Sequence, residues 1–141
     1  MNAPRDAADW ASRTAPDLAA FEVMARDAYA GLPDDFLKFC GELVILIEDF
    51  PTDEMLDSLE LESPFDLLGL FEGLGLAQAG DSGWTGREPN RIWLFRRPIL
   101  DYWADHEETL GGVISHVLIH EIGHHFGLSD DDMEAIEAAA D

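Results

Sequence analysis

The pattern of hydrophobic and polar positions predicts a chain of short helices with two strands between them. Apolar residues recur at helical spacing up to Gly31, after an N-cap predicted at Thr14, and again from about residue 107 to residue 126. The segments LVILIED (43–49) and RIWLFRR (91–97) are short, apolar and followed by proline, as is typical of buried strands. The leucine-rich segment 53–76 predicts one or two short helices, and DDDMEAIEAAA predicts a terminal helix. The pattern therefore predicts an α+β fold in which a small sheet packs against helices.

The length of the chain is typical of one domain. Its 141 residues are 47% hydrophobic, which is enough apolar material for a single core. Residues 1–13 are polar and alanine-rich, so we expect a flexible leader there, followed by one domain over residues 14–141. Cys40 is the only cysteine, and its apolar neighbours indicate a small core residue.

Charge narrows the choice of partners. The formal net charge is −22, which repels nucleic acid and anionic lipid. It favours a cationic partner or substrate, such as a basic peptide or protein, or simply keeps the protein soluble. The charge is also expected to keep the protein monomeric. The N-terminus has no apolar segment of the kind found in secretory signals, and no apolar run is long enough to span a bilayer, so a cytoplasmic protein is expected.

The segment HEIGHHFGLSD (120–130) holds the chemistry that the pattern favours most. His120 and His124 are four residues apart, so a helix places both imidazoles on one face, where they can bind one zinc ion. Glu121 lies beside this pair and can act as the general base for a zinc-bound water. The H-E-x-x-H pattern is typical of zinc peptidases, although five positions with three fixed also occur by chance on polar helices.

A catalytic zinc needs a third protein ligand, and three residues compete for that place. Asp130 ranks first, because Gly127 allows the chain to leave the helix and Asp130 then follows His124 by six residues. His116 ranks second, since it lies one turn before His120 on the same face. Glu137 ranks third, because it belongs to the segment just after the turn.

The remaining histidine of the segment, His125, points about 100° away from the face of His120 and His124. We expect it to have a supporting or structural role.

The segment HEIGHHFGLSDDDM resembles the H-E-x-x-H-x-x-G-x-x-D signature of the minimal zincin-like metallopeptidases, which are small bacterial proteins. RIWLFRRPI and DLLGLFEGL are also similar to that group, so the resemblance covers roughly residues 35–135. It implies a compact zincin-like fold related to that of archaemetzincins and metzincins, with the active-site helix near the C-terminus. It also implies zinc held by His120, His124 and Asp130, with Glu121 as the general base. Met133 follows Asp130 too closely to form the separate methionine turn of larger metzincins.

Three functions from different classes remain open. The first is a zinc metallopeptidase that hydrolyses peptide bonds through a water activated by Glu121. The alternative is a non-catalytic metal-binding or protein-interaction module on a zincin scaffold, which the small size of the chain favours. An acidic protein that captures a basic partner is the weakest hypothesis, since the charge alone supports it.

Overall fold

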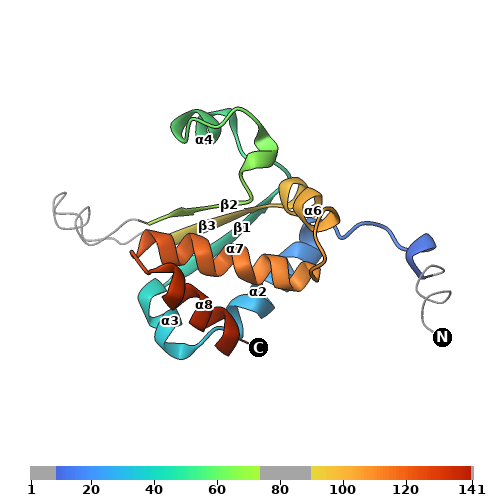
Figure 1. Ribbon diagram of the computed structural model, residues 1–141. Coiled ribbons are helices and arrows are strands. Elements are labelled where there is room, and N and C mark those ends of the chain that lie inside the picture. The colour runs from blue at the N-terminus through green and yellow to red at the C-terminus, as the bar shows by residue number, and fades with distance from the viewer. Residues whose placement is uncertain (1–8, 74–89, 141) are drawn as a thin grey trace.

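A computed structural model of the protein describes residues 9–73 and 90–140. In this part of the chain, β1 (Leu43–Glu48), β2 (Gly69–Glu72) and β3 (Asn90–Phe95) form one sheet in the order β1-β3-β2 (Figure 1). The central strand β3 runs parallel to β1 and antiparallel to β2. The predicted α+β class is therefore confirmed, and the strands expected at residues 43–49 and 91–97 are both present.

Helices cover both faces of the sheet. Helices α2 (Leu18–Ala30) and α7 (Leu110–His125) pack against one face, with α3 (Asp34–Cys40) and α8 (Asp130–Ala139) beyond them (Figure 1). The short helix α4 (Asp53–Ser58) and the 3₁₀ helix η1 (Pro64–Asp66) lie on the other side, and α6 (Arg96–Ala104) follows β3 directly. Across the described ranges, no helix has both the length and the apolar character needed to cross a membrane.

The alternation of side chains along β3 divides the apolar residues into two cores. Ile92 and Leu94 point towards α2 and α7 and belong to the main core. Phe95 belongs to a smaller core with Leu56 and Leu67, against which Trp93 packs. The main core holds the fully buried residues of α7, so the helix that carries the candidate motif is fixed along one side.

The prediction for the segment that forms β2 was wrong, because the leucines of residues 53–76 indicated only helices. A short apolar run such as residues 67–71 does not distinguish a strand from a buried helical segment, and pairing with β3 decides the matter here. The strand also approaches α7 closely at Gly69, where an added Cβ would lie 2.7 Å from Cγ1 of Val117. Glycine is thus needed for contact between the sheet and the helix.

Two predicted boundaries also differ from the structure. Helix α2 is capped by Asp17 rather than by Thr14, since the Asp17 carboxylate accepts a hydrogen bond from the backbone N–H of Ala20 at 2.8 Å. Strand β3 ends at Phe95, and Arg96 already belongs to α6, with Pro98 in its first turn, where a missing N–H costs no helical hydrogen bond. Residues 1–8 of the predicted leader lie outside the described residues.

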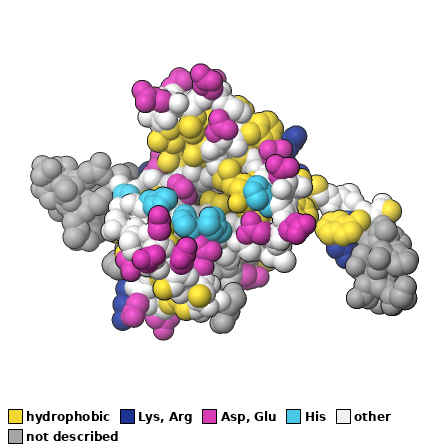
Figure 2. All heavy atoms as spheres, in the orientation of Figure 1, with side chains coloured by type: hydrophobic (Ala, Val, Ile, Leu, Met, Phe, Trp, Pro, Cys, Tyr) yellow, Lys and Arg dark blue, Asp and Glu magenta, His cyan; other side chains and the backbone are white. Residues whose placement is uncertain are grey.

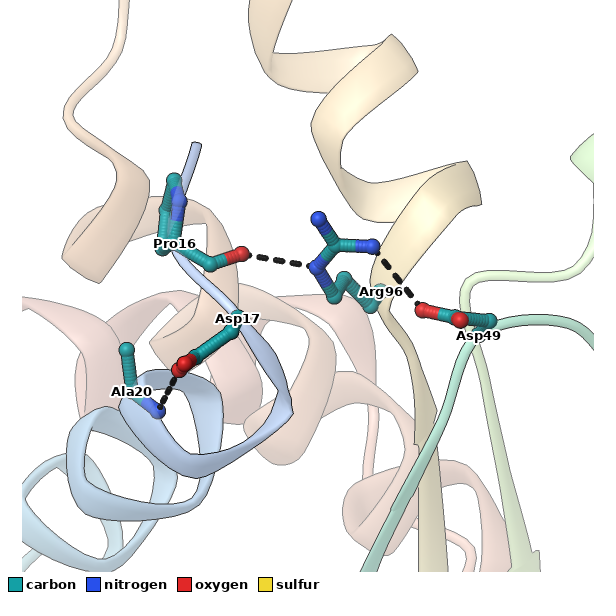
Figure 3. A network of polar contacts seen from close by, with 5 residues as sticks. All are labelled: Pro16, Asp17, Ala20, Asp49 and Arg96. Atoms are coloured by element: carbon teal, nitrogen blue, oxygen red, sulfur yellow. Dashed lines mark hydrogen bonds and ion pairs between the residues drawn. The ribbon is translucent and has the colours of Figure 1, made fainter. Parts of the chain in front are cut away.

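The side chain of Arg96 connects three segments that are distant in sequence (Figure 3). Its Nε donates to the carbonyl of Pro16 at 2.7 Å, and its Nη1 donates to Oδ1 of Asp49 at 2.9 Å. The guanidinium therefore joins the entry to α2, the end of β1 and the start of α6. Its side chain is only 19% exposed, so the pairing is better shielded from solvent than an ordinary surface ion pair.

Candidate metal centre

Helix α7 presents the candidate motif because its sequence separates an apolar side from a histidine side. Thr109 begins the helix by accepting a hydrogen bond from the N–H of Gly112 at 3.0 Å. The helix contacts α2, α6, α8 and the sheet, and its buried apolar positions are Val113, Ile114, Val117, Leu118, Ile119 and Ile122. His116, His120 and His124 follow one another at intervals of four residues and therefore form a stripe along the partly exposed part of the helix.

A tight turn brings α8 back against α7. Gly127 has φ +76°, a conformation that favours glycine, and the N–H of Leu128 donates to the carbonyl of Gly123 at 2.9 Å. Ser129 and Asp132 then start α8 with a capping box. The two helices approach closely where Gly123 meets the fully buried Met133, since an added Cβ at Gly123 would lie 2.5 Å from Sδ of Met133.

The return of α8 places a carboxylate between two of the histidines. Oε1 of Glu137 lies 2.6 Å from Nε2 of His120 and 3.0 Å from Nδ1 of His116. The two imidazole rings stack with their centroids 3.9 Å apart. The side chains are partly exposed, and Figure 2 shows histidines in a row across the molecule with acidic side chains directly below them. His116, His120 and Glu137 are called the upstream cluster below.

The upstream cluster has the donor chemistry of a metal site. One potential ligand atom from each residue lies within 4.8 Å of the other two. Two imidazole nitrogens and one carboxylate oxygen form a set that suits zinc. The residues present therefore fit a divalent metal ion.

The structure places the other predicted metal ligands further apart. The ring of His124 is exposed, and its centroid lies 5.8 Å from that of His120, with the planes at 79°. Asp130 is exposed at the first position of α8. Neither residue belongs to the group whose ligand atoms lie within 4.8 Å of one another. The assignment of His120, His124 and Asp130 as a ligand set thus remains a prediction.

Glu121 is partly buried beside the histidine stripe. Burial raises the pKa of its carboxyl group above the ordinary value, and the nearby charge of His124 partly opposes that shift. The residue lies about 100° further round the helix than His120, on the side that leads towards the sheet. A carboxylate next to a predicted ligand, and partly withdrawn from water, is suitably placed for proton transfer.

His125 has the supporting place that the sequence predicted. Its ring lies 4.3 Å, centroid to centroid, from that of Phe71 on β2 and 5.0 Å from that of Phe126. Gly73 also approaches it closely, since an added Cβ there would overlap the His125 ring. His125 thus packs the end of α7 against the edge of β2 and lies outside the upstream cluster.

Glu137, which the sequence analysis ranked third, is the carboxylate that the structure brings to His120 and His116. The signal was present, because Asp130, Glu134 and Glu137 recur at helical spacing. A helix that folds back after a four-residue connection would turn such a stripe towards the histidines of α7. The spacing of HEIGHHFGLSD alone drew attention to Asp130 instead.

Comparison with known families adds independent support for this region. The family model described as zincin-like metallopeptidase matches residues 40–140, which include the whole sheet, α7 and α8. No curated protein matches the chain, so the assignment rests on the family model. That model spans more than half of the sequence and includes every residue of the motif and of the upstream cluster. The chain therefore belongs to the zincin-like metallopeptidase family.

Proposed function

We propose that the protein is a zinc-dependent metallopeptidase that hydrolyses peptide bonds with Glu121 as the general base. One observation carries the proposal. The His120-Glu121-x-x-His124 motif lies on α7, whose opposite side is locked into the core, in a chain of the zincin-like family. A rigid helix keeps the histidines and the glutamate in fixed relative positions, as catalysis requires.

In this proposal His120, His124 and Asp130 hold the metal. A bound zinc ion supplies a Lewis acid and lowers the pKa of water towards neutrality. Gly127 and the capping box at Ser129 support the role of Asp130, since they start α8 one turn beyond His124. A rotation of exposed side chains would complete the set, because both His124 and Asp130 are exposed.

Glu121 carries the proton through the reaction. Its carboxylate takes a proton from the attacking water while the water oxygen bonds to the peptide carbonyl carbon. The same carboxyl group then gives that proton to the amine nitrogen as the C–N bond breaks. No side chain of the protein needs to become covalently attached to the substrate.

The sheet offers an edge for an extended peptide. In the described residues β2 pairs with β3 alone, and β2 contacts α7, the helix that carries the motif. An extended substrate could therefore add as a strand along the other edge of β2. Strand β3 is paired on both sides and therefore has no edge to offer a substrate. The net charge of −22 favours basic peptides as substrates. A monomer in the cytoplasm, without nucleic-acid or membrane partners, completes the proposal.

The decisive experiment compares Glu121→Gln with wild type in a peptide-library cleavage assay with zinc added. Loss of the proton acceptor is expected to reduce cleavage about 10²–10⁴-fold. Bound zinc, measured by elemental analysis, should stay unchanged, since Glu121 is not a ligand in this proposal. Glu134→Gln is the matched control, because Glu134 is an exposed glutamate of α8. Equal cleavage by Glu121→Gln and wild type would refute the mechanism.

The alternative is a non-catalytic metal-binding module, and the upstream cluster favours it. Its three donors already converge without the participation of His124 or Glu121. This alternative predicts that zinc stabilises the protein against heat while no peptide in the library is cleaved. Thermal melting with and without a chelator, next to the cleavage assay, separates the two functions.

A further inference from the structure

We propose that the upstream cluster is a metal site in its own right, and that it competes with the motif residues for His120. The chain would then hold a divalent ion such as zinc in either of two positions about one helical turn apart. One position uses His116, His120 and Glu137, and the other uses His120, His124 and Asp130. The existence of the upstream site rests on geometry alone. The competition rests on the proposed function, because that proposal supplies the second ligand set.

The distances within the upstream cluster are close to those of a filled site. Two donors on a tetrahedral zinc, with bonds of about 2.0–2.1 Å, lie roughly 3.3 Å apart. Oε1 of Glu137 is 2.6 Å from Nε2 of His120 and 3.0 Å from Nδ1 of His116. A small outward shift of the partly exposed Glu137 would therefore admit an ion. In the metal-free protein these three atoms are linked through protons, and the metal ion would take the place of those protons.

The backbone already fixes the approach of the three residues. His116 and His120 are one turn apart on α7, whose other side is buried. Glu137 is held in place by the packing of α8 on α7. One helical turn before Glu137, the buried Met133 of α8 packs against Gly123 of α7. A preformed arrangement of this kind loses little conformational entropy when an ion binds.

The surroundings also favour a cation. Asp130, Glu134 and Glu137 lie along one stripe of α8 by helical spacing, and acidic side chains collect directly below the histidine row in Figure 2. The protein has only eight basic side chains against thirty acidic ones. A divalent ion between two imidazoles and a carboxylate is thus attracted by its near environment as well as by its ligands.

The two positions exclude each other because both use His120. In the structure Nε2 of His120 faces Glu137, and a neutral imidazole offers that nitrogen to a single ion. Occupation of the motif position therefore requires His120 to leave Glu137. An ion held upstream lies away from His124, so exchange between the positions would regulate the proposed peptidase.

The test measures zinc binding to the metal-free full chain by calorimetry, with cobalt absorption spectra as a second readout. The variant His124→Ala/Asp130→Ala removes the motif ligands and leaves the upstream cluster intact. It is expected to bind one ion per chain. Addition of Glu137→Gln to this variant should weaken binding by about 100-fold or more, since even loss of an outer-shell partner costs up to that much. His116→Ala in the same background should have a similar effect.

Matched controls are Glu54→Gln on α4, on the other side of the sheet, and His106→Ala outside α7, which should leave binding unchanged. Circular dichroism shows whether each variant is folded, and all the substituted side chains are at least partly exposed. The proposal fails if the double variant binds no zinc, or if Glu137→Gln does not weaken its binding. Failure of the proposed function would appear instead in the cleavage assay, which this titration does not use.

Discussion

The two sides of α7 differ in how much of their arrangement the helix itself determines. The apolar residues are packed against α2, α6, α8 and the sheet, and six of them are buried. The histidine side is partly exposed and takes its nearest carboxylate from α8. A packed side chain has one place, because neighbouring atoms surround it. A partly exposed side chain is less tightly enclosed and can turn between partners, and for this reason we proposed two alternative ligand sets for His120.

The largest expected effect comes from truncation of the apolar side. Ile119→Ala should lower the free energy of unfolding by about 2–5 kcal/mol, because Ile119 is fully buried and leaves a cavity. His124→Ala on the exposed side should change it by less than about 0.5 kcal/mol in metal-free protein. Urea unfolding in the presence of a chelator measures both. Equal losses would show that the two sides are not energetically distinct.

Metal binding should make the histidine side of α7 contribute to the stability of the folded protein. Zinc at 100 times its dissociation constant is expected to stabilise the wild type by about 2.7 kcal/mol, since it binds the folded state. Chelation should remove this gain, and thermal melting at increasing zinc concentration measures it. His120→Ala should show almost no response to zinc, because both ligand sets use His120. A full response in that variant would contradict both sites.

The contact between α7 and α8 joins the two sides and can be tested by overpacking. Gly123→Ala should destabilise the protein by about 1–3 kcal/mol, because the new methyl group would overlap the buried Met133. In a Met133→Ala background the same substitution should cost much less, since the obstructing side chain is gone. A double-mutant cycle by chemical denaturation measures this coupling. Additive effects on the free energy of unfolding would show that the two residues do not interact.

The smallest expected effect concerns the ionisation of Tyr29 and Cys40, which pack with the main core, at alkaline pH. Burial, followed by the hydrogen bond with Cys40, raises the pKa of Tyr29 well above its usual value, and burial also raises the pKa of the Cys40 thiol. Both groups stay neutral in the fold, so their stabilising effect is complete below about pH 8, where the unfolded chain also keeps these protons. It should be lost as the pH rises towards the folded-state values, because the unfolded chain releases these protons first. Tyr29→Phe should lose stability less steeply above about pH 10, as denaturation at several pH values would reveal. An unchanged slope would exclude Tyr29 as its source.

Local signals in the sequence determined most of the elements. The apolar spacing of α7, with Gly127 at its end, predicted the helix that carries the motif, and the aliphatic run 43–49 predicted β1. These features depend on neighbours within a few residues, so a linear reading is sufficient. The motif residues were apparent for the same reason, since His120 and His124 are related by one helical turn.

Tertiary structure decided what depends on distant partners. The segment at Gly69 is a strand because β3 pairs with it and α7 approaches it, and neither partner is near in sequence. Arg96 joins Pro16 and Asp49 only once the fold brings them together. Glu137 reaches His120 because a tight turn and Met133 set the packing of α8 on α7. The sequence by itself thus determined the helix and its histidines. The carboxylate that faces them was decided by helix packing, because packing depends on side chains that meet only in the folded protein.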